Sequence, residues 1–235
     1  MTTAPTPVPH HSAVRPLTIV LVVALVAVTV VAVVGWERAS SNREEGSGAP
    51  ATQTRRVPAF TSLELTGSAV VAARIGPRRS VVVHADRNLI DRVTTSVRQG
   101  RLAVGTRGGF RTKSPMHVDV VAPSLDLVRL SGSGVLTVEG LRQAHVVVRL
   151  PGSGVLRVTG AVGRVDAGLS GSGDLQLESL VARDGRATVS GSGRLQVHAT
   201  RTLSAAVSGT GAIFYYGSPA TVTTSVSGTG AIIRS

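Results

Sequence analysis

Six Gly/Ser-rich tetrads recur in the second half of the chain and constrain its fold more than any other feature of the sequence. They begin at residues 131, 151, 170, 190, 208 and 227, so their starts lie 20, 19, 20, 18 and 19 residues apart. A period near 20 residues is typical of solenoids, in which each repeat is a rung stacked on its neighbours. Tightly stacked corners need residues without a Cβ atom. The predicted structural turn residues are Gly132, Gly134, Gly152, Gly154, Gly171, Gly173, Gly191, Gly193, Gly209, Gly211, Gly228 and Gly230.

Alternating apolar residues flank each tetrad. After the tetrad at 151, Leu156 and Val158 occupy every second position, and Val165, Ala167 and Leu169 do the same before the next tetrad. This period of two predicts β-strands. One rung is therefore predicted to be strand, variable turn, strand and Gly-rich turn. Stacking predicts one inward column of Leu136, Leu156, Leu175, Leu195, Ile213 and Ile232.

Residues 56–130 are predicted to be an irregular beginning of the same domain, because the terminal repeats of solenoids are commonly atypical. Leu89, Ile90, Val93 and Val97 fit either one helical turn or a strand. The shorter strands are expected at Ser62–Leu65, Ala69–Ile75, Ser80–Ala85, Arg101–Val104, His117–Val121 and Asp126–Leu130.

Three segments before the tetrads carry a family resemblance. They are RVPAFTSLELTGS (56–68), RQGRLAV (98–104) and VDVVAPSL (118–125). With the tetrads, they resemble the auto-transporter adhesin head GIN domain family over roughly residues 56–235. The resemblance implies an all-β, single-stranded right-handed parallel β-helix or β-solenoid with rungs of about 19 residues. It also implies export and an adhesive or envelope role.

The amino-terminal part contains an uncharged apolar run over residues 17–34. Eighteen helical residues extend about 27 Å, close to the thickness of the bilayer hydrocarbon. The apolar core of a cleavable signal is shorter, about 7–15 residues. An uncleaved transmembrane helix over 17–35 is therefore favoured, with Trp36 at the membrane interface. The expected organisation is a cytoplasmic head at 1–16, this anchor, a flexible linker at 36–55 and the solenoid domain at 56–235.

The orientation of this anchor does not follow from charge. Arg15 lies before the apolar run, whereas Arg38 and Arg43 follow it beside glutamates, so the two flanks are nearly balanced. The short head and large carboxy-terminal part favour a single-pass protein of the cell membrane, with the bulk of the chain extracytoplasmic.

The composition excludes several classes of chemistry. There is no cysteine, so disulfides and thiolate sites are absent. No pair among the six histidines outside the head has metal-ligand spacing, so no metal site is predicted. His84 and Asp86 share a strand face, and we expect a solvated pair there.

The column through Asp174 holds no other carboxylate, which argues against a calcium site. The tetrads lack the helix that a serine-hydrolase elbow or a phosphate loop needs. No catalytic residue and no cofactor are predicted.

The net charge of +12 points to anionic partners. Of the 25 basic residues only Lys113 is a lysine, and the charges of the first 45 residues cancel. Four arginines fall once per variable turn and are predicted to form a basic stripe: Arg142, Arg164, Arg183 and Arg201. The stripe suits an anionic envelope polymer or lipid headgroups. The alternative is that these are ordinary solvated turn residues. Specific nucleic-acid binding is not expected, because aromatic residues for base stacking are missing.

An aromatic cluster lies near the carboxy terminus. Aligning residues 211–215 with 134–138 places Ile213 and Tyr215 inward, and Phe214 and Tyr216 outward. Phe214 and Tyr216 are therefore the candidate contact surface for a sugar ring or a partner protein. The alternative is packing against a neighbouring loop or a second subunit.

The sequence favours a membrane-anchored, extracytoplasmic, non-catalytic adhesion module with an unknown surface protein, glycan or anionic polymer as partner. The alternative is an envelope regulatory or sensory accessory protein. A polysaccharide-active enzyme is disfavoured, because Asp166, Asp174, Glu178 and Asp184 are scattered along the rungs. The last tetrad stands close to Ser235, which leaves an open strand ladder and predicts a possible homo-oligomer.

Overall fold

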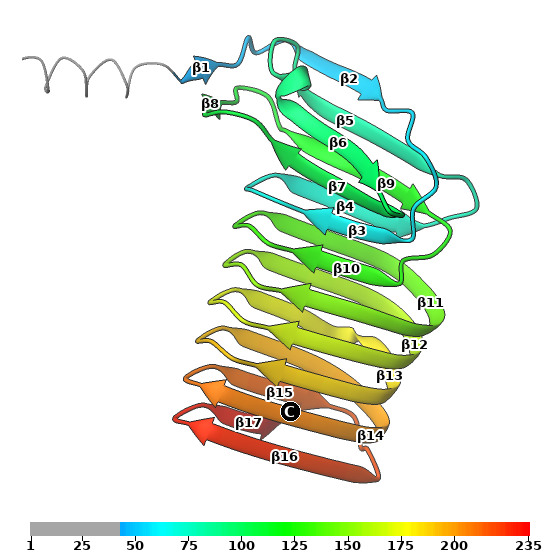
Figure 1. Ribbon diagram of the computed structural model, residues 1–235, viewed down its shortest axis with the longest axis vertical. Helices are drawn as coiled ribbons and strands as arrows, with labels where there is room; N and C mark the ends of the chain where they lie inside the picture. Colours follow the sequence, from blue (N-terminus) through cyan, green and yellow to red (C-terminus); the bar gives the residue numbers. More distant parts are fainter. Residues whose placement is uncertain (1–42) are drawn as a thin grey trace, which may run out of the picture. The chain divides into compact units, whose positions relative to one another are not determined.

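Residues 43–235, the part of the chain that the computed structural model describes, consist of β-strands and turns with no α-helix among them. Parallel pairing builds the stacked part, and Figure 1 shows β10 to β14 as successive layers. The predicted all-β solenoid is confirmed. Its strands are β3 (Ser62–Leu65), β4 (Val70–Ile75), β7 (Arg101–Thr106), β9 (His117–Ala122), β10 (Leu127–Leu130), β11 (Val135–Leu150), β12 (Val155–Leu169), β13 (Asp174–Val189), β14 (Arg194–Gly209), β15 (Ala212–Tyr216), β16 (Thr221–Gly228) and β17 (Ala231–Arg234).

The variable part of each regular rung is a bent strand and not the expected turn. β11, β12, β13 and β14 each run through it without a break, as their curved ribbons in Figure 1 show. The register slips at the bend, for example between Val138 and Leu141. Pairing resumes directly after the slip, as between Leu141 and Gly160, so the rungs stay paired on both sides of the corner. Gly140, with φ of 76°, supplies a conformation there that other residues rarely adopt.

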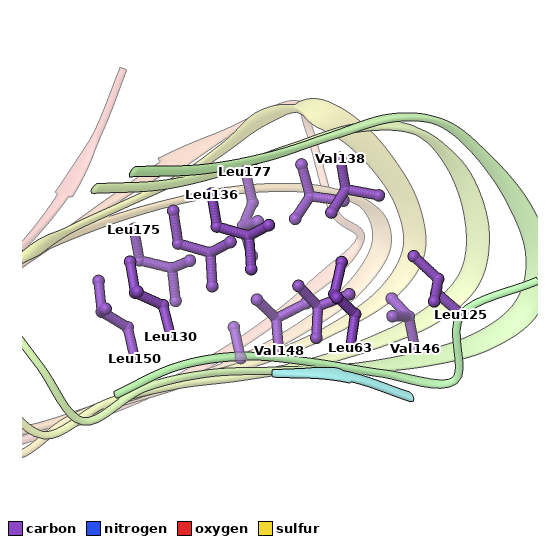
Figure 2. Packing of buried hydrophobic residues seen from close by; sticks show 14 of the residues in the cluster. Leu63, Leu125, Leu130, Leu136, Val138, Val146, Val148, Leu150, Leu175 and Leu177 are labelled. Atoms are coloured by element: carbon purple, nitrogen blue, oxygen red, sulfur yellow. The ribbon is translucent and has the colours of Figure 1, made fainter. Parts of the chain in front are cut away.

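The core lies between the two halves of every rung. Register pairs Leu136 with Leu156, Leu156 with Leu175, and so on to Ile232, which confirms the predicted inward column. Its members from Leu136 to Ile213 are fully buried, and only Ile232 remains half-buried. Figure 2 shows Leu136 and Leu175 meeting Leu130 and Leu150 from the opposite side. Small aliphatic residues therefore fill a thin core without aromatic bulk.

The tetrad glycines are required by close approach between rungs. A Cβ atom on Gly171 would lie 2.8 Å from the carbonyl carbon of Gly152 and nearer still to its oxygen. The corners also bond to one another, since Gly154 N donates to Gly132 O over 3.1 Å. Each tetrad is thus a corner that rests directly on the corner of the preceding rung.

The first rungs are assembled out of chain order. β4 pairs with β11 and β3 with β10, so the turn at Gly67 lies under the first tetrad. β7 and β9 then pair with β3 and β4 on the far side. Antiparallel strands complete this end: β5 (Ser80–Asp86) pairs with β9, β2 (Pro50–Thr54) with β5, and β6 (Val93–Arg98) with β7. The irregular beginning expected over 56–130 is therefore confirmed.

The segment from Leu89 to Val97, for which the sequence allowed a helical turn or a strand, contains both. A 3₁₀ turn spans Ile90–Arg92 and leads directly into β6. Leu89 and Val93 are buried on either side of the turn. The apolar spacing of four residues therefore reflects one turn followed by a strand.

The described part of the expected flexible linker, residues 43–55, is ordered, so that prediction is wrong there. It contains β1 (Glu44–Glu45), which pairs with β8 (Phe110–Arg111), and β2. Asp86 explains the order: its fully buried carboxylate accepts hydrogen bonds from Gly48 N (2.9 Å), Lys113 N (2.8 Å) and Ser114 Oγ (2.8 Å). Burial raises the pKa of Asp86, but these bonds outweigh burial and lower it below its usual value. The ionised carboxylate joins three separate segments.

The head at 1–16, the anchor at 17–35 and the linker up to residue 42 lie outside the described residues. Within 43–235, no helix has the length and apolar character to cross a bilayer.

The final rung exposes apolar side chains, Val222, Val226 and Ile233 among them.

Candidate anion-binding site

Arginines gather on the outer face of the second half of the rungs. Register pairs Arg129 with Arg149, and Arg149 with Gly168. In the neighbouring outward column, Asp166 pairs with Arg186. Strand periodicity turns these positions away from the core, which is formed by the alternate residues.

Gly168 makes room between these arginines. With no side chain at this place in the column, a hollow of about 570 Å³ opens on the sheet. The Arg149 side chain leans over it, since its Cδ lies 3.1 Å from where a Cβ on Gly168 would stand. The residues that line the hollow include Arg129, Arg149, Arg164, Arg186, Asp166, Ser170, Thr188 and Ser190. Its volume lies in the range of small-molecule sites.

The charges of the hollow are only partly balanced. Arg129 Nε lies 3.1 Å from Glu64 Oε1, and Arg164 Nη2 lies 3.2 Å from Asp166 Oδ1. Arg149 donates to the carbonyl oxygens of Asp166 (2.6 Å) and Val148 (3.1 Å). Among residues 43–235, no carboxylate pairs with Arg149 or Arg186. Four arginines against Glu64 and Asp166 leave a net charge of +2.

The carboxylates beside the hollow are held in their charged forms. Burial tends to raise the pKa of Asp166, but hydrogen bonds from His145 and Arg164 prevail and lower it. At the bend, hydrogen bonds from Arg201 and Thr202 lower the pKa of Asp184 to about 2. Groups that stay ionised at neutral pH are poor general acids. They orient arginines instead.

The predicted basic stripe is divided by the structure. All four of its arginines are exposed near the bend, but Arg142 pairs in register with Ala161 and Arg164 with Asp184, so they do not share one column. Arg201 Nη2 lies 2.5 Å from Asp184 Oδ2, and Arg183 Nε lies 3.9 Å from the same oxygen. Only Arg164 joins the hollow. Sequence reasoning missed Arg129, Arg149 and Arg186, which lie on the straight return strands.

The ion pair between Arg201 and Asp184 at the bend is expected to make the stability of the domain depend on pH in acid. The pKa of Asp184 falls from 3.8 to about 2 on folding, so its contribution is complete above about pH 4 and is lost as the pH falls toward 2. Asp184→Asn is expected to flatten the stability curve between these values. Urea unfolding of both proteins from pH 7 to pH 2 checks this. Parallel curves below pH 4 contradict it.

The aromatic residues lie where the sequence predicts. Phe214 pairs with Gln196 in the outward column, and Tyr216 pairs with His198. Both side chains are half-buried: the Arg194 guanidinium lies 5.5 Å from the Phe214 ring centre, and Gln196 Nε2 donates to Tyr216 Oη over 3.2 Å. Phe214 borders a shallow hollow of about 420 Å³ along tetrad hydroxyls, Ser172 and Ser192 among them. A flat ring beside hydroxyl groups suits a sugar ring.

The double variant Phe214→Ser/Tyr216→Ser tests this surface. Its two lost contacts are worth about 1–2 kcal/mol together, so a fall of only a few degrees in melting temperature is expected. Binding of a neutral glycan to the aromatic surface should be abolished, as glycan-array fluorescence would report. A melting temperature lowered by more than about 10 °C would identify Phe214 and Tyr216 as packed structure.

The structure also tests the sequence expectations for Asp174 and for the histidines. The column through Asp174 holds no second carboxylate, as expected, and Gln176 donates to Asp174 over 2.7 Å. The expected solvated pair of His84 and Asp86 is wrong, because Asp86 is buried. The spacing of the histidines in the sequence predicted no metal site, but the rings of His84 and His117 stack with centres 4.3 Å apart.

Comparison with known proteins gives a family model and similar folds. The model described as "putative auto-transporter adhesin, head GIN domain" matches residues 59–219. A putative adhesin from Bacteroides fragilis has a similar structure, with TM-score 0.68 and 18% identity over 81% of this chain and 99% of that one. A putative lipid binding protein from Parabacteroides distasonis follows, with TM-score 0.53 and 21% identity over 83% and 100% of the two chains. At these identities the likeness concerns the fold. No curated protein matches the sequence.

Proposed function

Because the chain belongs to the putative auto-transporter adhesin, head GIN domain family, we propose that it is a non-catalytic interaction module of the cell surface. Its ligand is an anionic envelope polymer or glycan, held at the arginine hollow. The observation that carries this proposal is the convergence of Arg129, Arg149, Arg164 and Arg186 on one concave site.

The chemistry of the hollow supports an anion. Guanidinium groups present paired donors that match phosphate, sulfate and carboxylate oxygens. Ser170, Thr188 and Ser190 add hydroxyls to the lining, which suit the neutral parts of a glycan. Because the residues that line the hollow come from several successive rungs, a long polymer can contact them along the stack.

A binding role also fits the state of the nearby acids. Asp166 is held by His145 and Arg164, with Nε2 to Oδ2 and Nη2 to Oδ1 distances of 2.8 Å and 3.2 Å. Hydrolysis of a glycoside needs two free carboxyl groups about 5–10 Å apart, one of them protonated. Asp166 is committed to its ion pairs, so it serves here as a positioning group for Arg164.

Membrane attachment through residues 17–35 belongs to the same proposal and rests on the apolar sequence alone. It places the domain outside the cell, near envelope polymers. Protease treatment of intact cells is expected to digest residues 56–235. Protection of this region, or a secreted form that begins near Trp36, argues against the attachment.

The binding proposal is tested with the full chain in detergent, titrated with dextran sulfate and with neutral dextran. These probes share a backbone and differ in charge. We expect dextran sulfate to bind much more tightly than neutral dextran, and its affinity to fall as salt screens the charges. Arg149→Gln/Arg186→Gln should reduce the affinity for dextran sulfate at least about tenfold, because each substitution removes a charge-assisted contact with the ligand.

The matched control is Arg142→Gln/Arg183→Gln, which removes the same charge from arginines outside the hollow. It should change the affinity less than about threefold. Equal losses in the two double variants, or equal binding of neutral dextran, contradict a specific site.

A further inference from the structure

Two histidines and an aspartate meet on an outer face at the antiparallel end of the domain, where Figure 1 shows β2, β5 and β9 together. His84 on β5 lies directly opposite His117 on β9. Asp119 follows His117 by two residues, so strand periodicity turns both to the same face. The pairing of β5 with β9 thus brings together residues that are far apart in the sequence.

The three side chains bring their ligand atoms close together. One ligand atom from each lies within 4.8 Å of the others. Asp119 Oδ2 is 3.2 Å from His84 Nε2 and 3.8 Å from His117 Nε2. The imidazole rings stack with an angle of 6° between their planes. A single ion shared by the three groups, with bonds of about 2.0–2.2 Å, requires the stacked imidazole rings to rotate.

A threonine side chain next to the three ligands orients one of the histidines. Thr52 on β2 pairs in register with His84, and its Oγ1 lies 3.1 Å from His84 Nδ1. A hydrogen bond to one ring nitrogen fixes the orientation of the other, which is a regular feature of metal-binding histidines. His84 Nε2 is thereby aimed at Asp119.

The site is also open on one side. His84, His117 and Asp119 keep 29%, 39% and 49% of their side-chain surfaces exposed. His84 and Asp119 border a hollow of about 720 Å³. An ion bound here therefore has room for water or for an additional ligand beside its three protein ligands.

We propose that His84, His117 and Asp119 bind a divalent transition-metal ion of the zinc type. Two imidazole nitrogens and one carboxylate oxygen suit Zn²⁺ and its first-row neighbours, whereas Ca²⁺ and Mg²⁺ require more oxygen ligands. The site shares no residue with the arginine hollow. It therefore stands or fails independently of the proposed function.

The test is calorimetric titration of Zn²⁺ into the full chain in detergent, without an affinity tag. His10 and His11 are both changed to Ser in every protein, because adjacent histidines in the head also attract zinc. One ion per chain is expected, with no measurable binding of Ca²⁺ or Mg²⁺. Co²⁺ should give visible absorption bands when it occupies the same site.

Three variants assign the ligands. His117→Gln should weaken Zn²⁺ binding at least about 100-fold, and Thr52→Val about tenfold, through loss of a ligand and of its orienting contact. His145→Gln is the matched control, since His145 also contacts an aspartate at 2.8 Å but forms no such three-residue cluster within residues 43–235. It should leave the affinity unchanged.

Thermal melting without metal shows whether each variant is folded, and Asp119→Asn provides a second ligand variant if His117→Gln is not. Zinc affinity that is unchanged in Thr52→Val and in the folded ligand variants overturns the proposal. An equal loss in His145→Gln overturns it as well, because it would show binding by scattered surface histidines.

Discussion

Gly171→Val is expected to lower the free energy of unfolding by at least about 3 kcal/mol. The new Cβ would lie 2.8 Å from the carbonyl carbon of Gly152 and nearer to its oxygen, where only backbone atoms could yield. The two corners must then separate, which breaks the pairing of the rungs on both sides. Urea denaturation followed by circular dichroism measures the loss.

The control for this substitution is Gly168→Ala. The three atoms nearest to a Cβ at Gly168 all belong to the flexible Arg149 side chain, at 3.1 Å or more. Its stability should stay within about 1 kcal/mol of the unmodified chain. Comparable losses at Gly168 and Gly171 would show that close stacking of the tetrads is not what requires glycine.

Leu156→Ala should cost about 2–5 kcal/mol, the second large effect. Leu156 is fully buried between Leu136 and Leu175, with paired rungs on both sides that prevent collapse around the cavity. Ile232→Ala, in the same column but half-buried on the last strand, should cost only about 1 kcal/mol. Urea unfolding of both variants checks this gradient.

Because contacts in a solenoid are mostly between nearest neighbours, the effect depends on a residue's position along the stack. Equal losses at Leu156 and Ile232 would contradict the view that rungs are buried by the rungs on either side.

The repeated part of the fold was predictable because the tetrads set the register. Once Gly152 lies over Gly132, every alternate residue that follows is assigned to the core or to the surface. Leu136 and Leu156 could therefore be aligned from sequence, and so could Phe214 and Gln196. Local alternation and a fixed corner were sufficient.

The amino-terminal end was less predictable because long-range side-chain contacts determine it. Asp86 binds residues near positions 48 and 113, and neither local composition nor periodicity indicates this. The Gly/Ser-rich sequence of residues 46–48 therefore suggested a linker. His84 and His117 meet through antiparallel pairing across a segment without repeats, so their spacing carried no metal signature.

The arginine hollow shows how register slips mislead a sequence alignment. The stripe was predicted by counting one arginine per bend, where the register changes between rungs. The return strands have no such slip between Val165 and Leu169, so Arg129 and Arg149 stay aligned with Gly168. An alignment of the return strands of successive rungs, in place of the bends, would have revealed this column from the sequence.

The most direct test of the central claim is a nuclear magnetic resonance titration of the arginine Nε–H signals with a sulfated dextran oligosaccharide. The full chain in detergent micelles is used. The signals of Arg129, Arg149 and Arg186 are predicted to shift together and to saturate, while those of Arg142 and Arg183 stay in place. Shifts spread evenly over all exposed arginines, or concentrated at the bend, would contradict a specific anion-binding hollow.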